Sequence, residues 1–165
     1  MLQLSDREWK EFKIGDIFDK SKCDYGKDMK YPVTENTTDI PIVSGQTTNN
    51  GVIGYVKRSN IASKIYKDSL TISTRGEYSG TVFYHKGEFV LNNNIMVLAL
   101  HNEKSYRVKL FMIVPLSNLG YGGYGNYPKR DEMMERCLWL PVTPIGQPDY
   151  DFMEQYIRER ERARL

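Results

Sequence analysis

Four polar segments of the chain carry cations, carboxamides or tyrosines, which are side chains able to bind phosphates or read bases. They cover residues 20–31, 44–51, 74–89 and 124–130. Arginine can contact guanine at two points, and asparagine or glutamine can do the same with adenine, whereas lysine, serine and threonine suit phosphates. The candidate binding residues are Lys22, Tyr25, Lys27, Gln46, Thr47, Asn49, Asn50, Arg75, Tyr78, Ser79, Tyr124, Tyr127, Lys129 and Arg130. Solvated surface loops carry the same residue types, so composition alone also allows loops without any ligand.

Residues that could catalyse a reaction or hold a cofactor do not form a working pattern. The segment GYGGYG has the spacing G-x-G-x-x-G, but Asn126 and Pro128 follow it and prevent the helix that a dinucleotide site requires. His85 and His101 lie in different segments without a neighbouring cysteine, which does not favour a metal site. No nucleophile elbow, phosphate loop or complete nuclease signature is present. The sequence therefore predicts a binding protein that is not an enzyme and needs no cofactor or metal.

Length, charge and cysteine usage limit the number of domains, the class of partner and the cellular compartment. A chain of 165 residues predicts one domain with a sizeable core. The net charge of +2 neither requires nor excludes nucleic acid, and the twelve tyrosines suit either a wet contact surface or β-structure. Two distant cysteines, the lack of a long apolar run and an N-terminus unlike a signal peptide predict a reduced, cytoplasmic protein that does not enter a membrane.

The elements that must position the four segments are mostly short strands. We expect strands at WKEFKI, IPIVS, GVIGYV, SLTIST, GTVFYH, EFVL, IMVLAL and the end of EMMERCLWLPV, with a long loop over residues 19–39. Because no ten-residue helix separates the central strands, the pattern favours a twisted antiparallel or mixed sheet, or a partial barrel. The segment KSYRVKLFMIV could be a helix or a strand, and Pro115 should end it. A C-terminal helix should begin near Tyr150, capped by Asp149 or Asp151. The fold class is therefore α+β, with few short helices.

The order of these segments resembles the target recognition domains of specificity subunits in type I restriction–modification systems. WKEFKIGDIF resembles the opening of such domains, IPIVSGQTTNNGVIGYV and LTISTRGEYSGTVFYHKGEF resemble the strand and hairpin that follow, and GYGNYPKRDEMMERCLWLPV with GQPDYDFMEQYI is similar to their close. This last part is most like specificity subunits of type I-like and bipartite-site type II systems. Residues 20–39 and 45–56 match only in character.

The resemblance implies a function and partners. It implies a domain over residues 1–146 that reads half of a split sequence in double-stranded DNA, followed by the start of a spacer helix over residues 147–165. The methyltransferase and restriction subunits, which use S-adenosylmethionine for methylation, would be separate proteins. Such subunits usually hold two domains of this kind, so a homodimer through the C-terminal helix is one expectation. The alternative is that Phe152, Met153, Tyr156 and Ile157 pack that helix back on its own domain.

The resemblance also gives Arg75 a hypothetical role. Gly76 and Gly80 bracket a tight turn at a hairpin tip, which would place Arg75 where it can reach a DNA groove; an ion pair with Glu77 or Glu88 is the alternative. Lys129 suits a phosphate. Arg130 could instead cap or pair with Asp131 or Glu135 at the start of the next helix.

Two other functions stay open at this point. One is a β-rich domain that binds a protein or carbohydrate through its tyrosines, and the other is a small nuclease or hydrolase with an unrecognised site.

Overall fold

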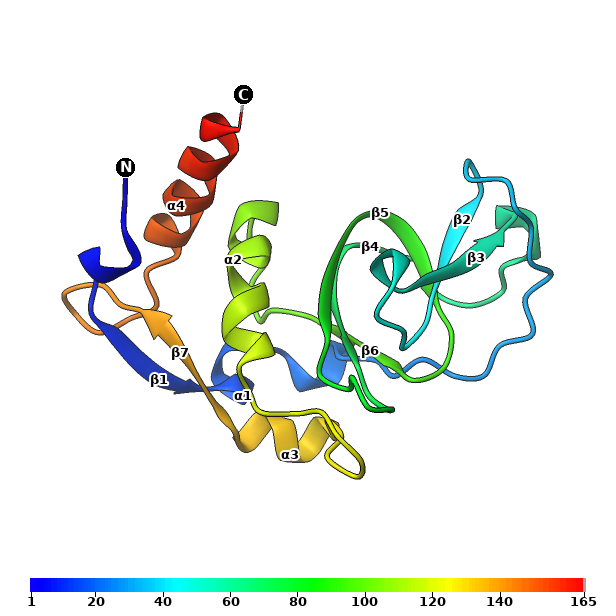
Figure 1. Ribbon diagram of the computed structural model, residues 1–165, viewed down its shortest axis with the longest axis horizontal. Helices are drawn as coiled ribbons and strands as arrows, with labels where there is room; N and C mark the ends of the chain where they lie inside the picture. Colours follow the sequence, from blue (N-terminus) through cyan, green and yellow to red (C-terminus); the bar gives the residue numbers. More distant parts are fainter. Residues whose placement is uncertain (165) are drawn as a thin grey trace.

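The computed structural model describes residues 1–164, which form two small sheets joined by helices (Figure 1). One sheet pairs β1 (Trp9–Lys13) with β7 (Cys137–Pro141) in antiparallel register. The other has the strand order β3-β2-β5-β4-β6. Its strands are β2 (Ile40–Val43), β3 (Val52–Val56), β4 (Tyr66–Ser73), β5 (Val82–Leu91) and β6 (Ile95–Leu98). Since β2 and β5 run parallel and the other pairs antiparallel, the predicted mixed sheet is confirmed.

Short helices connect the two sheets. The α-helices are α1 (Ile14–Ile17), α2 (Tyr106–Ser117), α3 (Arg130–Glu135) and α4 (Tyr150–Ala163). Four single turns of 3-10 helix are η1 (Leu4–Asp6), η2 (Lys20–Lys22), η3 (Asn49–Gly51) and η4 (Arg58–Asn60). In Figure 1, α2 stands between the two sheets, while α4 and the N-terminus lie on the side away from β2 and β3. Among residues 1–164, no helix has the length and apolar character needed to cross a bilayer.

Two predicted strands are in fact one. GTVFYH and EFVL form the continuous strand β5, which is bent in Figure 1. The register against β4 shifts between Lys67 and Ser69, where Asp68 adopts a φ of 50°. Two residues of β5, Lys86 and Gly87, lie opposite the single residue Asp68, so β5 is the bulged strand and pairing resumes on both sides.

The segment KSYRVKLFMIV, for which the sequence allowed a helix or a strand, lies in helix α2. The expectation that Pro115 ends this element was wrong. Ser105 caps the helix by accepting a hydrogen bond from the Val108 amide at 3.3 Å. Pro115 does not stop it, since the proline lies within the last turn of the helix. The helix therefore continues to Ser117 and buries the proline ring.

The core consists of one large cluster and two small ones. The large cluster fills the space between α1, α2, α4 and the strands β4, β6 and β7, with Phe18, Met112 and Leu140 fully buried. A smaller cluster around Phe89 and Val43 lies beneath the β5–β6 connection. This second cluster includes residues of β2, β5 and β6, close to where the 44–51 segment leaves β2.

The first turns of α4 pack on the domain itself. Phe152 and Met153 are buried, and the Tyr156 ring meets the Phe111 ring of α2 edge-on at 5.6 Å between centroids. The Leu2 amide donates to Glu159 at 2.6 Å, and Arg160 donates to the Leu2 carbonyl at 2.8 Å. The apolar stripe of α4 thus serves the domain's own core, and the N-terminal segment runs beside the helix.

Asp149 is the residue that caps α4. One oxygen accepts from the Phe152 amide at 2.9 Å, and the other accepts from the Arg7 guanidinium at 2.9 Å. Replacing Asp149 by alanine should lower the free energy of unfolding by about 1–2 kcal/mol, because it removes the acceptor of the Phe152 amide at the helix terminus and the ion pair with Arg7. Urea unfolding followed by circular dichroism measures this change.

The matched control is Asp151→Ala, since Asp151 is exposed in the same first turn. It should cost less than about 1 kcal/mol, which is the size of a helix-dipole contact. Equal losses for the two variants would show that the cap does not hold α4.

Candidate nucleic-acid interface

A turn of three asparagines between β5 and β6 joins three of the four candidate segments. We call residues 92–94 the asparagine turn. The Asn94 carbonyl accepts the Thr74 amide at 3.0 Å, and the Asn93 carbonyl accepts the Gly45 amide at 3.2 Å. The Asn92 side-chain oxygen accepts the Met29 amide at 3.0 Å. Segments that lie far apart in the sequence are therefore held side by side by backbone amides that donate to the turn.

The backbones approach so closely that two positions admit only glycine. A Cβ atom on Gly26 would lie 1.7 Å from the Asn92 carbonyl oxygen, and one on Gly45 would lie 2.0 Å from the Asn94 carbonyl oxygen. Both distances are far inside van der Waals contact. These glycines are required by close approach, and they fix the spacing of the 20–31 and 44–51 segments against the turn.

The fourth segment docks on the hairpin that carries Arg75. The Gly123 amide donates to the Glu77 carbonyl at 2.8 Å, and the Ser79 hydroxyl donates to the Asn126 carbonyl at 3.0 Å. Gly80, with a φ of 88°, packs against Tyr121 so closely that an added Cβ would lie 2.6 Å from the tyrosine Cβ. The glycine-rich segment is thus a loop that covers the hairpin tip, and α3 begins only at Arg130.

Tyr25 and Arg130 join the first segment to the start of α3. The Arg130 amide donates to the Tyr25 hydroxyl at 2.6 Å, and the guanidinium lies 5.2 Å from the centre of the same ring. A second guanidinium nitrogen donates to the Cys23 carbonyl at 3.2 Å. Arg130 neither caps nor pairs with the two acidic residues considered from the sequence; Lys20 pairs with Asp131 and Lys13 with Glu135. Its guanidinium fixes the position of Tyr25.

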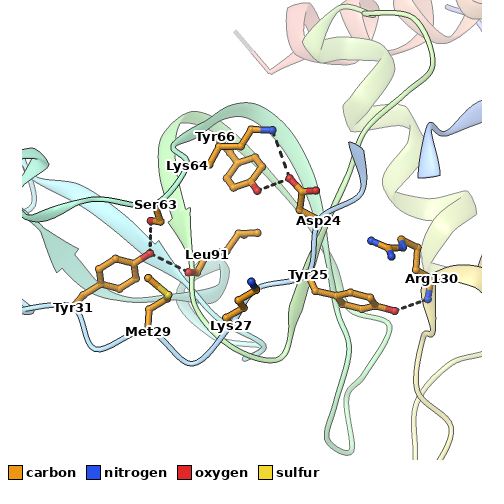
Figure 2. A pocket seen from close by; sticks show the side chains of 11 residues that line it. Asp24, Tyr25, Lys27, Met29, Tyr31, Ser63, Lys64, Tyr66, Leu91 and Arg130 are labelled. Carbon is orange, nitrogen blue, oxygen red and sulfur yellow. Dashed lines mark hydrogen bonds and ion pairs between the residues drawn. The ribbon is translucent and has the colours of Figure 1, made fainter. Parts of the chain in front are cut away.

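An open groove of about 450 Å³ lies beside this contact, walled by Tyr25, Tyr31 and Tyr66 (Figure 2). The Tyr66 hydroxyl donates to Asp24 at 2.6 Å, and Lys64 lies 3.5 Å from the same carboxylate. Burial, with the Asp24 carboxylate beside it, holds the pKa of Tyr66 well above its usual range. The groove therefore presents tyrosine rings to a ligand. Its Asp24 carboxylate is already bound by Tyr66 and Lys64, and Lys27 also lines the groove.

Four of the five candidate cations are exposed and have no internal ion pair. Within residues 1–164, the side chains of Lys22, Lys27, Arg75 and Lys129 form neither salt bridges nor hydrogen bonds. The alternative for Arg75 does not occur, because Glu88 pairs with Arg58 at 2.5 Å and no described carboxylate lies within reach of the Arg75 guanidinium. Cations that face water without partners can meet phosphates without first breaking an internal pair.

The predicted carboxamides are engaged within their own loop. The Gln46 and Asn49 side chains donate to the Val52 carbonyl at 2.9 and 3.2 Å. The Asn50 side chain donates to the Tyr84 carbonyl and to His85 Nδ1, both at 3.2 Å. Because His85 accepts at Nδ1, its Nε2–H donates to the Thr71 hydroxyl at 2.9 Å. Burial lowers the pKa of His85 to about 4, so the neutral ring keeps this arrangement near pH 7.

Of the remaining candidate residues, some are exposed and one is buried in a contact between loops. Tyr78 and Tyr124 are exposed, as is Thr47, whereas Tyr127 is half-buried. Ser79 is buried, and its hydroxyl is used in the contact with Asn126. The structure thus brings the predicted residues into one group of adjoining loops, but it gives Ser79, Gln46, Asn49, Asn50 and Arg130 internal partners.

Comparison with known proteins assigns the chain to a family. Residues 6–165 match the family described as the type I restriction modification DNA specificity domain. The chain belongs to this family. It is similar to the specificity subunit of the type II restriction enzyme BgcI from Heyndrickxia coagulans, with 31% identity over 96% of this chain and 45% of that subunit. It is also similar to a putative type I specificity subunit of Mycoplasma pneumoniae, with 32% identity over 88% of this chain and 39% of the relative.

Solved structures show the same fold for this specificity domain. The S subunit of a type I restriction-modification system from M. genitalium superposes with a TM-score of 0.67 at 13% identity, over 97% of this chain and 40% of that one. The HsdS subunit from Thermoanaerobacter tengcongensis gives a TM-score of 0.58 at 12% identity, over 94% of this chain and 38% of that one. The specificity domain spans less than half the length of these relatives.

The asparagine turn was not identified from the sequence as part of the candidate site. The signal was present, since three consecutive asparagines separate EFVL from IMVLAL and asparagine tolerates left-handed turns. What the sequence could not show is that three of the candidate segments donate hydrogen bonds to this turn.

Gly26→Ala tests whether the turn holds the loops in place. The added methyl would overlap the Asn92 carbonyl, and overpacking of this kind should lower the free energy of unfolding by about 1–3 kcal/mol. Thermal and urea unfolding of the variant provide the measurement.

Gly87→Ala is the control, because a Cβ there has no heavy atom within 4 Å. It should change the free energy of unfolding by no more than about 0.5 kcal/mol. A Gly26 variant as stable as this control would mean that the close approach does not constrain the first segment.

Proposed function

We propose that this chain reads a short sequence in double-stranded DNA and thereby directs separate modification and restriction subunits to it. The observation that carries the proposal is the set of four exposed cations without internal partners, on loops joined around one turn. Membership in a DNA specificity family supports the same reading. Phosphate contacts supply most of the affinity of such proteins and position them on the duplex.

The chain itself serves as a binding module in this proposal. Its similar proteins are named specificity subunits, which are the parts of restriction systems that select the site. Methylation and cleavage then belong to the modification and restriction subunits, and S-adenosylmethionine is bound there. A protein or carbohydrate site is the weaker candidate, because the tyrosine-walled groove is interrupted by engaged polar groups from Asp24 and Lys64.

The proposed contact set follows the geometry of the loops. Lys22, Lys27 and Lys129 contact phosphates, since each is a flexible point charge in solvent. Arg75 reads guanine from the hairpin, because its planar guanidinium can engage O6 and N7 together. Tyr78 and Tyr124 lie on the same loops and contact sugars or phosphates, while Tyr25 and Arg130 hold the first segment in position.

We also propose that residues 147–165 begin a spacer that contributes to assembly. Relatives more than twice as long as the matched segment have room for a second domain of this size. An apolar surface lies beside α4, where Val114 is 64% exposed and Trp139 is 55% exposed, next to Tyr156 and Ile157. A second copy of the chain is the occupant that we assign to this surface.

Val114→Lys tests the assembly surface without disturbing the core, because the Val114 side chain points mostly into solvent. A buried charge at an interface should weaken self-association by tenfold or more, equivalent to about 1.4 kcal/mol. Sedimentation velocity over a range of protein concentrations measures the dimerisation constant. A wild-type chain that stays monomeric, or a variant that dimerises equally well, rules out a dimer through this surface.

The DNA contacts are tested by Arg75→Ala and Lys129→Ala. Losing Arg75 should cost about 1–3 kcal/mol on the preferred duplex and relax the preference at one base pair. Losing Lys129 should weaken binding to all duplexes alike and reduce the slope of log K against log salt by about one unit. Binding to preferred and scrambled duplexes at several salt concentrations separates the two effects.

Arg162→Ala is the control, since Arg162 is an exposed arginine of α4, the helix on the side of the molecule away from β2 and β3 (Figure 1). It should leave affinity and salt dependence unchanged. An unaltered ratio of preferred to scrambled binding in Arg75→Ala would show that Arg75 does not read sequence.

A further inference from the structure

Asn94 differs from the other carboxamides of the candidate interface. The side chains of Gln46, Asn49 and Asn50 donate to backbone carbonyls of their neighbours. Asn92, Asn93 and Asn126 also use their side chains, in contacts with Met29, Ser44 and Gly120. Within residues 1–164, the Asn94 side chain is the one carboxamide of these loops with no hydrogen bond, and the residue is exposed. Its donor and its acceptor are both free for a ligand.

The backbone of Asn94 is held firmly although its side chain is free. Its φ is 62°, in the left-handed region that asparagine tolerates better than most residues. Its carbonyl accepts the Thr74 amide at 3.0 Å, and Gly45 packs directly against it. Because the backbone is already fixed, only the side chain has to lose conformational freedom when it binds.

The same hydrogen bond places Asn94 beside Arg75. Thr74, whose amide it holds, is the residue before Arg75, so the two free side chains start from adjoining positions on one surface. Base pairs are stacked about 3.4 Å apart along the duplex. Side chains that start so close together can therefore reach the same or neighbouring base pairs.

We propose that Asn94 is a specificity-determining residue that reads adenine in the major groove. Its carboxamide would donate an N–H to adenine N7 and accept the adenine N6 amino hydrogen, a pairing that no other base offers in the same pattern. The inference rests on the proposed function of the chain as a DNA reader. It adds a residue that the sequence did not single out and assigns it a base.

The variants follow from the unusual backbone of Asn94. Asn94→Gly removes the carboxamide and keeps the left-handed conformation, which glycine adopts freely. Asn94→Asp keeps the size and turn preference of the side chain but replaces the N–H donor by an oxygen. Asn93→Ala is a control from the same turn, since the Asn93 side chain accepts from Ser44 and shapes the loop.

The experiment begins with selection of duplexes from a randomised pool by the wild-type chain. Affinities are then measured for the selected duplex, for single-base-pair changes at each position, and for a duplex carrying 7-deazaadenine in place of the selected adenine. Thermal unfolding of each variant checks that the fold is kept. For the wild type, 7-deazaadenine should weaken binding, because it lacks the N7 acceptor.

Asn94→Gly should lose discrimination at one A·T pair by about 5- to 150-fold and become insensitive to 7-deazaadenine there. Discrimination at the pair read by Arg75 should persist, and Asn94→Asp should share the loss at adenine. Asn93→Ala should keep the adenine preference, or weaken all sequences together. Unchanged discrimination in Asn94→Gly, or an equal loss at every position in a folded variant, overturns the assignment to adenine. A wild-type chain that enriches no sequence from the pool defeats the proposed function itself, which is a different outcome.

Discussion

The close approach of four backbone segments at the asparagine turn is the constraint on which the candidate interface depends. Gly26 and Gly45 lie against the carbonyls of Asn92 and Asn94 at distances that no Cβ atom would permit. Backbone hydrogen bonds from Gly45 and Thr74 close the arrangement. Loops held in this way lose little further freedom on binding, so their side chains can be presented at a fixed spacing.

The distribution of charge explains how a chain with a net charge of only +2 can present a basic surface. Away from the loops, several charges are neutralised in networks: Arg107 bridges Glu154 and Glu161, and buried Lys109 contacts Asp68 and Glu103. In the loops, Lys20 and Lys30 pair with Asp131 and Asp28, whereas four other cations keep no partner among residues 1–164, namely Lys22, Lys27, Arg75 and Lys129. Local excess of this kind, and not the total, determines the attraction to a polyanion and its dependence on salt.

Much of the fold could be predicted because each strand carries its own signal. Alternation and turn residues located the short strands, and the absence of long helices among them indicated a mixed sheet. The union of two strands into β5 could not be predicted, because pairing with β4 continues on both sides of a bulge in which Lys86 and Gly87 lie opposite Asp68. Pro115 also misled, since it lies in the last turn of α2 and the helix continues to Ser117.

The candidate site shows a similar division. Residue types identified the four segments, and Arg75, Lys27 and Lys129 are exposed as a binding role requires. The sequence could not distinguish free side chains from engaged ones: Gln46 and Asn50 looked like base readers but hold their own loop, whereas Asn94 was overlooked. The folded shape of the loop decides this for Gln46, which bonds Val52, and contacts with the distant residues Tyr84 and His85 decide it for Asn50.

Hydrogen–deuterium exchange of the chain with and without its selected duplex tests the central claim most directly. If the loops around the asparagine turn form the DNA surface, the duplex should slow exchange in residues 24–31, 74–80, 92–94 and 122–129. Exchange in α2 and α4 should stay unchanged, and raising the salt concentration should remove the protection. Protection confined to α2 and α4, or none in the four loop segments when the duplex is bound, would contradict the account.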